Sequence, residues 1–130
     1  MGDALTNLKL QKLLYYAQAW FLALIDRGIF QEDFQAWVHG PVLPSQYHRF
    51  RACEWRPIDL RVRRADALPH KVLAHIDEII RVFGVESAIS LEVMTHREEP
   101  WKKARRGLPP TAPSNAIITK DSMKEFYKRM

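Results

Sequence analysis

The amino-acid sequence predicts a mainly α-helical protein: a compact, single-domain helical bundle over residues 1–130 around a central N-terminal helix, with room for a small two-stranded β-ribbon. The 130 residues suit one domain and allow roughly two-thirds of the unfolded surface to be buried. Hydrophobic residues make up 47% and charged residues 27%, which is typical of a globular protein rather than a disordered or membrane protein. Several segments also repeat apolar residues at the spacing of one helical face.

Residues 8–26 form the clearest predicted helix. Thr6 can cap its start and Gly28 can end it. Its apolar residues follow the spacing of one face: Leu10, Leu13, Leu14, Ala17, Phe21 and Leu24. Aromatic residues widen that stripe and predict neighbours on several sides: Tyr15, Tyr16 and Trp20. Polar residues are expected to mark the solvent-facing side: Lys9, Gln11 and Lys12.

The middle of the chain predicts short elements. Residues 34–38 alternate in a way that permits a short strand before a Gly-Pro corner. Pro44 suits a first helical turn, so residues 45–52 can form a short helix. Residues 58–62 alternate over the length of an edge strand, which could pair with the first strand.

An amphipathic helix is expected in the second half of the chain. Asp66 or Pro69 lies near its start and Gly84 at its end. Its apolar face has helical spacing: Val72, Ile76, Ile79 and Phe83. Ser87 can cap a following helix, which Pro100 closes.

The C-terminal part predicts a loop and then a helix. Residues 107–114 contain three prolines and are typical of an irregular loop. Thr119 can start a last helix. That helix can dock on the core through its apolar residues: Met123, Phe126, Tyr127 and Met130.

The sequence favours a cytoplasmic location. The longest apolar stretch, residues 13–25, contains Gln18 and is too short to span a bilayer, and no signal-peptide pattern opens the chain. The single cysteine, Cys53, cannot form an internal disulfide and fits a reducing compartment. We therefore expect no membrane partner.

The sequence lacks the usual motifs for binding a metal or cofactor or for an activated nucleophile, which argues against catalysis. His70 and His75 do not align on one helical face, and neither an HExxH nor a CxxC pattern is present. The five glycines are scattered, which argues against a phosphate-binding loop. Cys53 near His48 lacks the local signature of a nucleophile, and a free core cysteine is the commoner case. We expect no metal, no cofactor and no catalytic residue.

Two stretches are rich in aromatic, imidazole and proline groups. Residues 36–44 take a stiff path because two prolines fix the backbone, and residues 95–101 end a predicted helix. Stiff loops of this kind often form recognition surfaces, and a core tryptophan beside a tight corner is the alternative interpretation. We expect Trp37 and Trp101 to lie close together. If only one of the two rings is open, that ring is the better candidate for a partner contact.

An acid–base site of His39, His96 and Glu98 is a further hypothesis. Each histidine lies beside a tryptophan motif, where regular structure breaks. Nothing in the sequence supplies an oxyanion hole, a metal or an activated nucleophile. Histidines bonded to backbone at loop corners are therefore the favoured interpretation.

Basic residues form two clusters in a chain of formal charge +5. The first is an arginine cluster: Arg49, Arg51, Arg56, Arg61, Arg63 and Arg64. The second is a run after Trp101: Lys102, Lys103, Arg105 and Arg106. Either cluster could meet nucleic acid or an acidic protein, or could simply be solvated.

Three stretches together resemble the Panacea domain family. They are residues 10–20 (LQKLLYYAQAW), residues 36–42 (AWVHGPV) with Tyr47, and residues 95–101 (THREEPW). The family includes SocA-type antitoxins and phage-associated proteins of the GepA type, and the resemblance runs from about residue 5 to residue 127. The chain departs from the family pattern at Ser45-Gln46, where an acidic residue is expected after the proline, and at Pro109-Pro110, which lies in a variable loop.

The resemblance implies a non-enzymatic protein antitoxin, encoded beside a toxin, that binds the toxin and neutralises it. It acts either as a proteolytic adaptor to the ClpXP protease, as in SocA-type systems, or by direct occlusion. A DNA-binding regulator of its own operon is the alternative function, and a His-dependent hydrolase is less favoured. The candidate partner-binding residues come from the two unusual stretches and the second basic cluster: Trp37, His39, Gly40, Pro41, Tyr47, Thr95, His96, Glu98, Trp101, Lys103 and Arg105.

Overall fold

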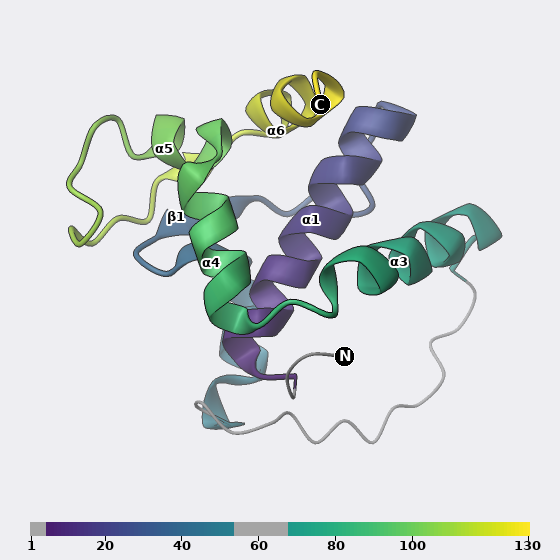
Figure 1. Cartoon of the computed structure of the whole chain (residues 1–130), viewed down its shortest axis with the longest axis horizontal. Coiled ribbons are helices and arrows are strands. Elements are labelled where there is room, and N and C mark those ends of the chain that lie inside the picture. Colours follow the sequence, from purple (N-terminus) through teal and green to yellow (C-terminus); the bar gives the residue numbers. More distant parts are fainter. Residues whose placement is uncertain (1–4, 54–67) are drawn as a thin grey trace.

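A computed structural model describes residues 5–53 and 68–130, and it shows a mainly helical molecule with a small antiparallel sheet (Figure 1). The described helices are α1 (Asn7–Ile25), α2 (Pro44–Arg49), α3 (His70–Phe83), α4 (Ala88–Arg97), α5 (Glu99–Ala104) and α6 (Lys120–Lys128), with a short 3-10 helix, η1 (Arg51–Cys53). The described strands are β1 (Phe34–Trp37), β2 (Gly40–Val42) and β3 (Ile117–Ile118). The predicted fold class is confirmed, and the sheet has a third strand beyond the expected ribbon.

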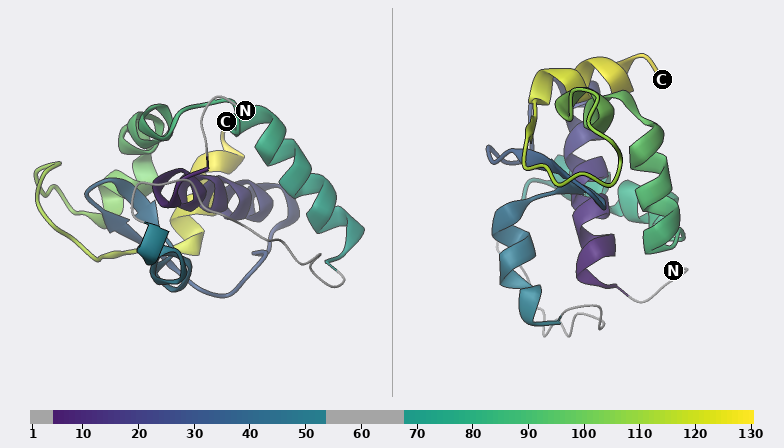
Figure 2. Two further views of the ribbon diagram at one scale, coloured as in Figure 1. Left: turned by 90° about the horizontal axis from the view of Figure 1, so that it is seen from below. Right: turned by 90° about the vertical axis from the view of Figure 1, so that its left-hand side faces the viewer.

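Helix α1 forms the centre of the fold, as predicted, and α3, α4, α6 and the sheet pack around it (Figures 1 and 2). Thr6 caps its start by accepting a hydrogen bond from the Lys9 N–H over 3.2 Å. The helix ends earlier than predicted because Asp26 takes a left-handed conformation with φ of 70°. Gly28 instead lies against Gln18: a Cβ at Gly28 would be 2.7 Å from Gln18 Nε2.

The predicted solvent-facing side of α1 is wrong. Lys9, Gln11 and Lys12 are 0%, 0% and 1% exposed. Because α1 is enclosed on several sides, two of these side chains satisfy backbone groups of neighbouring loops. Lys9 Nζ donates to the Gly84 carbonyl over 2.8 Å, and Gln11 Oε1 accepts from the Leu43 N–H over 2.9 Å. Hydropathy along the sequence does not reveal such partners, which offset the cost of burying a polar group.

Part of the predicted apolar stripe of α1 is more open than expected. Leu24 is 67% exposed, and Leu10, Leu13 and Leu14 are half-buried. These last three leucines line an apolar cavity of about 330 Å³ between α1 and α3. The core also contains buried residues outside this stripe, from α1 and from the elements packed on it, and most of them are aromatic: Tyr15, Tyr16, Phe34, Leu91, Trp101, Met123 and Tyr127.

The sheet has the strand order β2-β1-β3, and both pairings are antiparallel. Strand β1 confirms the strand predicted at residues 34–38, whereas the partner predicted at residues 58–62 lies outside the described residues. In the structure β1 pairs with β2 directly after a turn at Val38 and His39, and with β3 on its other side. The predicted Gly-Pro corner is therefore wrong, because those two residues belong to β2.

Gly40 allows the β1–β2 hairpin to approach the helices closely. Its φ of 109° is one that L side chains rarely adopt. A Cβ at this position would lie 2.9 Å from both Lys12 Cε and Thr95 Oγ1. Pro41 is tolerated next to it because β2 is an edge strand, where not every N–H needs a partner in the sheet.

Most predicted helix limits in the second half are confirmed. Gly84 ends α3, while Ser87 and Thr119 cap α4 and α6 through hydrogen bonds of 3.0 and 3.2 Å. Pro100 does more than close α4: it lies in the first turn of α5, a helix that the sequence did not predict. This short helix carries Trp101 into the core, where it is 4% exposed. No helix in the described ranges has both the length and the apolar character needed to cross a membrane.

Candidate partner-binding site

The two tryptophan motifs meet, as predicted. The Trp101 Nε1–H donates to the Trp37 carbonyl oxygen over 2.8 Å across 64 positions of sequence. Trp101 is buried, whereas the Trp37 ring is half-buried and lies edge-on to Tyr47 with ring centroids 4.9 Å apart. The Trp37 Nε1–H donates to Gln35 Oε1 over 2.8 Å, which fixes the indole. Trp37 is the more open ring and hence the better candidate for a partner contact.

Trp37 lines a cleft of about 250 Å³, called the Trp37 cleft below. Its lining is mostly apolar: Leu8, Trp37, Val38, His39, Val42, Tyr47, Pro113 and Ser114. Three of the predicted contact residues, Trp37, His39 and Tyr47, therefore share one surface feature. Rigid aromatic walls of this kind suit an apolar anchor side chain from a partner.

His39 lies in the turn between β1 and β2, at the rim of this cleft. Its Nδ1 is 3.0 Å from Glu92 Oε1, and the two side chains are 63% and 28% exposed. Exposed ion pairs of this type contribute about 0–1 kcal/mol to stability. His39 is therefore accessible to a partner and contributes little to the fold.

Several other predicted contact residues lie on the inner side of the β1–β2 hairpin or beneath it. Gly40 and Pro41 are buried in β2, and Thr95 is 1% exposed with its hydroxyl donating to the Glu92 carbonyl over 2.8 Å. The His96 ring stacks on Trp101 with centroids 4.0 Å apart. Burial lowers the pKa of His96 and thus favours the neutral imidazole, while the negative charge of Glu92 acts in the opposite direction. These residues position the hairpin rather than form its outer surface.

Lys12 also lies beneath the hairpin, close to Gly40 and Thr95. Its Nζ is buried and makes no hydrogen bond to the described part of the chain. Burial lowers the pKa of Lys12 to about 8, and the negative charge of Glu92 acts in the opposite direction. An ammonium group in this position destabilises the folded state whenever it is charged.

Glu98 joins three elements through hydroxyl groups. Its Oε1 accepts hydrogen bonds from the Tyr16 hydroxyl at 2.6 Å and the Tyr127 hydroxyl at 2.8 Å. The Tyr15 hydroxyl lies 3.2 Å from that of Tyr127 and extends the network. Burial raises the pKa of Glu98, while the two tyrosine donors act to lower it. Glu98 thus ties the junction of α4 and α5 to α1 and α6.

The hypothetical acid–base trio does not form a common site. His39 is paired with Glu92, His96 is stacked on Trp101, and Glu98 is bound by tyrosine hydroxyls. The negative charge of Glu92 also acts on His96, but no hydrogen bond or ion pair joins Glu98 to either histidine within the described residues. The arrangement therefore does not support the hydrolase hypothesis.

The second basic cluster divides into inward and outward side chains. Arg105 is 2% exposed, and its guanidinium donates to the carbonyls of Ala36 at 2.9 Å and Pro109 at 3.0 Å, and also to that of Ala112. It also lies over the Trp101 ring, 4.7 Å from the centroid. Arg105 thus belongs to the interior and not to the exposed surface on which it was expected. Lys103 is exposed, as expected.

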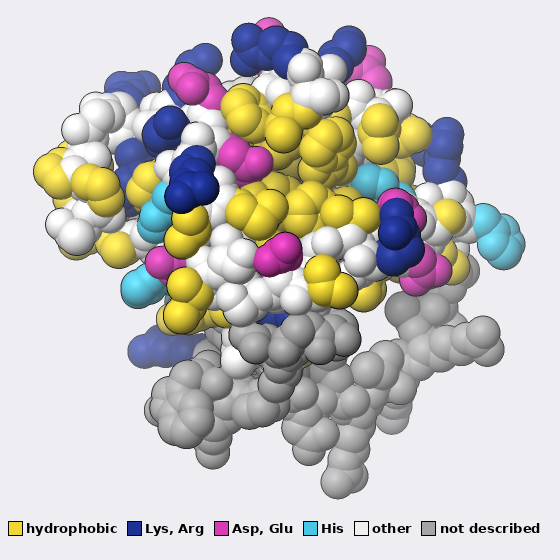
Figure 3. Space-filling model, in the orientation of Figure 1, with side chains coloured by type: hydrophobic (Ala, Val, Ile, Leu, Met, Phe, Trp, Pro, Cys, Tyr) yellow, Lys and Arg dark blue, Asp and Glu magenta, His cyan; other side chains and the backbone are white. Residues whose placement is uncertain are grey.

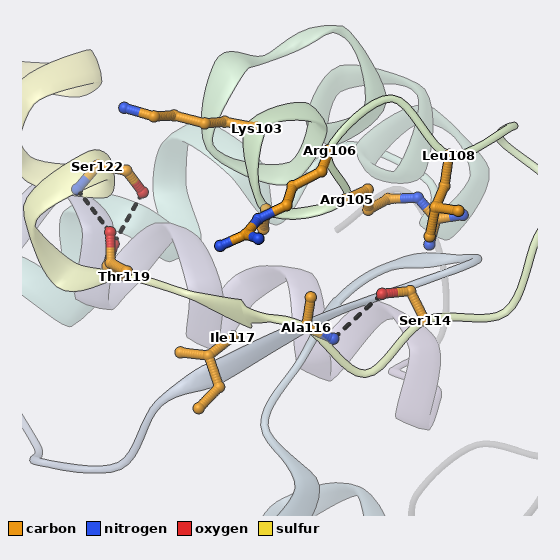
Figure 4. Close-up of a pocket in the computed structure, with 10 residues that line it drawn as sticks. Lys103, Arg105, Arg106, Leu108, Ser114, Ala116, Ile117, Thr119 and Ser122 are labelled. Carbon is orange, nitrogen blue, oxygen red and sulfur yellow. Dashed lines mark hydrogen bonds between the residues drawn. The ribbon is translucent and has the colours of Figure 1, made fainter.

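Lys103 and Arg106 border a cleft of about 760 Å³, called the basic cleft below (Figure 4). Its lining combines cations, hydroxyl groups and apolar side chains: Lys103, Ala104, Arg105, Arg106, Leu108, Ser114, Ala116, Ile117, Thr119 and Ser122. The sequence indicated this surface only through its basic run. Residue type alone could not distinguish the inward Arg105 from the outward Arg106.

An apolar hollow on another face was not predicted. It has a volume of about 240 Å³ and lies between α1 and α3: Trp20, Leu24, His75, Glu78, Ile79, Val82 and Phe83. Figure 3 shows hydrophobic side chains gathered in the middle of the face formed by α3, α4 and α6.

Of the first basic cluster, Arg49 and Arg51 are exposed near α2, and the remaining four arginines lie outside the described residues.

Comparison with known proteins identifies the family of this chain. Residues 10–102 match the family model described as "Antitoxin SocA-like, Panacea domain". Antitoxin SocA of Caulobacter vibrioides (strain NA1000 / CB15N) is 32% identical over 115 residues, which cover 79% of this chain and 61% of that protein. The chain thus spans about three-fifths of the length of this curated relative. No solved structure was found to match this chain. The chain belongs to the SocA-like antitoxin family of Panacea-domain proteins.

Proposed function

We propose that this protein is an antitoxin that binds a cognate protein toxin and thereby neutralises it. Membership of the SocA-like antitoxin family is the observation that carries the proposal. The ionisable groups suspected of acid–base chemistry are engaged in separate structural contacts, which supports binding rather than catalysis.

The contact face in this proposal combines the Trp37 cleft with the basic cleft. Ser114 lines both, so an apolar site and a cationic site adjoin. Among the predicted contact residues, Trp37, His39, Tyr47 and Lys103 line these clefts and are accessible there. A toxin surface with an aromatic or aliphatic anchor beside carboxylates would complement both.

Co-expression with the protein encoded by the neighbouring reading frame tests the proposal. Growth should stop with the neighbour alone and recover when both are made, and the two proteins should co-purify. Trp37→Ala with Tyr47→Ala should weaken binding at least about tenfold, as expected for anchors costing more than 1.4 kcal/mol. Lys102→Ala, an exposed change on α5 outside both clefts, is the matched control and should bind normally.

Leu24→Ser tests the competing face. Leu24 is 67% exposed and lines the apolar hollow between α1 and α3. If Leu24→Ser weakens toxin binding and the Trp37–Tyr47 change does not, the contact face lies at that hollow. If neither growth recovery nor co-purification occurs with wild-type protein, the antitoxin proposal itself fails.

We further propose that neutralisation proceeds either by delivery of the toxin to the ClpXP protease or by direct occlusion. The lifetime of the toxin distinguishes the two modes. Adaptor action requires that the toxin disappear faster when this protein and the protease are both present, and that it accumulate when the protease is removed. Neutralisation with an unchanged toxin lifetime would leave occlusion.

A further inference from the structure

We propose that the basic cleft binds an extended, acidic segment of the partner, which adds a strand to the outer edge of β3 at Ile117. The identity of the partner as the toxin rests on the proposed function. The mode of recognition, an added strand flanked by two cations, is argued from the cleft itself.

The sheet ends at β3. The order β2-β1-β3 leaves the side of β3 opposite β1 without a neighbouring strand in the described residues. Phe34 pairs with Ile118, and the Ala36 N–H donates to the Ala116 carbonyl over 2.8 Å. Because backbone groups alternate between the two edges of a strand, the N–H and C=O of Ile117 point away from β1. These are the groups with which another strand would pair.

The outer edge of β3 borders the basic cleft. Ala116 and Ile117 line one wall, and Lys103 and Arg106 come from the end of α5 on the opposite wall (Figure 4). The volume of about 760 Å³ lies in the upper part of the range typical of ligand clefts. A strand added to β3 would lie about 4.8 Å from it, within the cleft.

The charge of the cleft selects an acidic occupant. No carboxylate is present among its lining residues. Lys103 and Arg106 are exposed, and neither forms an ion pair with any residue in the ranges 5–53 and 68–130. Arg105 is committed to backbone carbonyls, so these two side chains supply the available positive charge. Carboxylates of a bound partner segment would pair with these two cations.

Apolar side chains of the cleft favour a peptide over a nucleic acid. Ile117 is 53% exposed and Leu108 is 46% exposed, so both present uncovered aliphatic surface. A strand that alternates acidic and aliphatic residues would place carboxylates near the cations and cover these two side chains. A phosphate backbone could meet the cations but would not use the free edge of β3.

The cationic wall is held in place before a partner binds. Arg106 has φ of 51° and Gly107 has φ of 79°, so the chain turns sharply after α5. Directly before this turn, the Arg105 guanidinium donates to the Ala36 carbonyl of β1. The wall carrying Arg106 is therefore fixed relative to the sheet, which reduces the ordering required when a strand enters.

Two pairs of variants of the full chain test the proposal, with the neighbour-encoded toxin as the probe. Ile117→Pro removes the outward N–H at an edge position that tolerates proline, and Ile117→Val keeps that N–H. The double variant Lys103→Glu with Arg106→Glu reverses the charge of both exposed cations of the cleft. Lys71→Glu with Lys102→Glu makes the same change in net charge at exposed positions outside the cleft. We expect each cleft variant to weaken toxin binding more than tenfold and each control to change it less than twofold.

Hydrogen exchange on the wild-type chain gives a readout that needs no variant. The Ile117 amide should exchange rapidly in the free protein and become protected by more than tenfold in the complex. This measurement keeps the proposal testable if Ile117→Pro fails to fold. An Ile117 amide that stays unprotected in a complex of full affinity would overturn the added strand.

The remaining outcomes separate this inference from the antitoxin function. If wild-type protein neutralises the toxin and all four variants bind it equally well, the antitoxin function stands and the cleft is not its contact. If the double reversal instead abolishes binding to a duplex DNA probe with a steep salt dependence, the occupant is nucleic acid and the proposal is overturned.

Discussion

Replacement of Lys12 by methionine should stabilise the protein at neutral pH. The lysine is 1% exposed, and its Nζ finds no hydrogen bond within the described residues. At pH 7 the ammonium is charged in both the folded and the unfolded chain, so folding must bury the charge. The fall in pKa from 10.5 to about 8 corresponds to about 3 kcal/mol at 1.36 kcal/mol per pKa unit. Methionine has a similar length and no charge, so much of this free energy should appear as added stability.

The pH dependence provides the second readout for Lys12→Met. Between pH 8 and 10.5 the unfolded chain keeps a proton that the folded chain has released, so this lysine makes wild-type stability rise with pH. The variant lacks that rise. Burial raises the pKa of Tyr15 and Tyr16, which lowers stability at high pH, but it does so in both proteins. The difference between wild type and variant therefore isolates Lys12.

Urea denaturation between pH 6.5 and 10, followed by tryptophan fluorescence, measures both effects. The gap in unfolding free energy should be largest near pH 7 and should shrink toward pH 10. Lys102→Met, at an exposed position of α5, should change stability by less than about 0.5 kcal/mol. A Lys12→Met variant that is less stable at every pH, or a gap that is constant with pH, would refute the reasoning.

Three further predictions follow from the same contacts. Gly40→Ala should lower the free energy of unfolding by at least about 2 kcal/mol, because Gly40 has a positive φ and two close neighbours. Gly107→Ala should cost about 1 kcal/mol, because no atom lies within 4 Å of the added Cβ. Equal losses in urea denaturation would contradict this prediction. Arg105→Ala should lower the free energy of unfolding by about 3 kcal/mol, because it leaves buried carbonyls without a hydrogen-bond donor. Arg106→Ala, at an exposed position, should lower it by less than about 0.5 kcal/mol. Thermal denaturation that finds Arg106→Ala the less stable variant would contradict this prediction. His96→Ala should lower stability by removing the ring stacked on Trp101, while His39→Ala should leave stability intact and act on toxin affinity alone, which calorimetry and binding assays can separate.

The sequence predicted the elements of this fold better than their orientation. Caps at Thr6, Ser87 and Thr119 were recognisable because a side-chain oxygen before a helix satisfies an amide of the first turn. The central place of α1 followed from its many aromatic residues. The inward face of α1 did not follow, because Lys9 and Gln11 are buried with backbone partners in loops far away in the chain. Such partners exist only after folding.

The candidate site was predictable in composition but not in arrangement. The meeting of Trp37 and Trp101 followed from two aromatic motifs placed where regular structure stops. The basic cleft did not, because one of its walls is β3, a two-residue strand with no alternation that could reveal it. The division of neighbouring arginines into a buried Arg105 and an exposed Arg106 depends on the end of α5, a helix of six residues with a proline in its first turn.

The three stretches that carry the family resemblance are largely internal, and this has a consequence for partner choice. The Gln11 side chain accepts a hydrogen bond from the Leu43 N–H, and the Trp101 indole donates one to the Trp37 carbonyl. Glu98 accepts a hydrogen bond from the Tyr16 hydroxyl of α1. A chain with these motifs therefore places the hairpin and the α4–α5 junction in fixed positions, whatever its surface chemistry. Some side chains that a partner can reach, Trp37 and His39, belong to these motifs, whereas others, such as Lys103, lie outside them. The same scaffold can thus present different surfaces, which is why the motifs indicate an antitoxin without identifying the toxin.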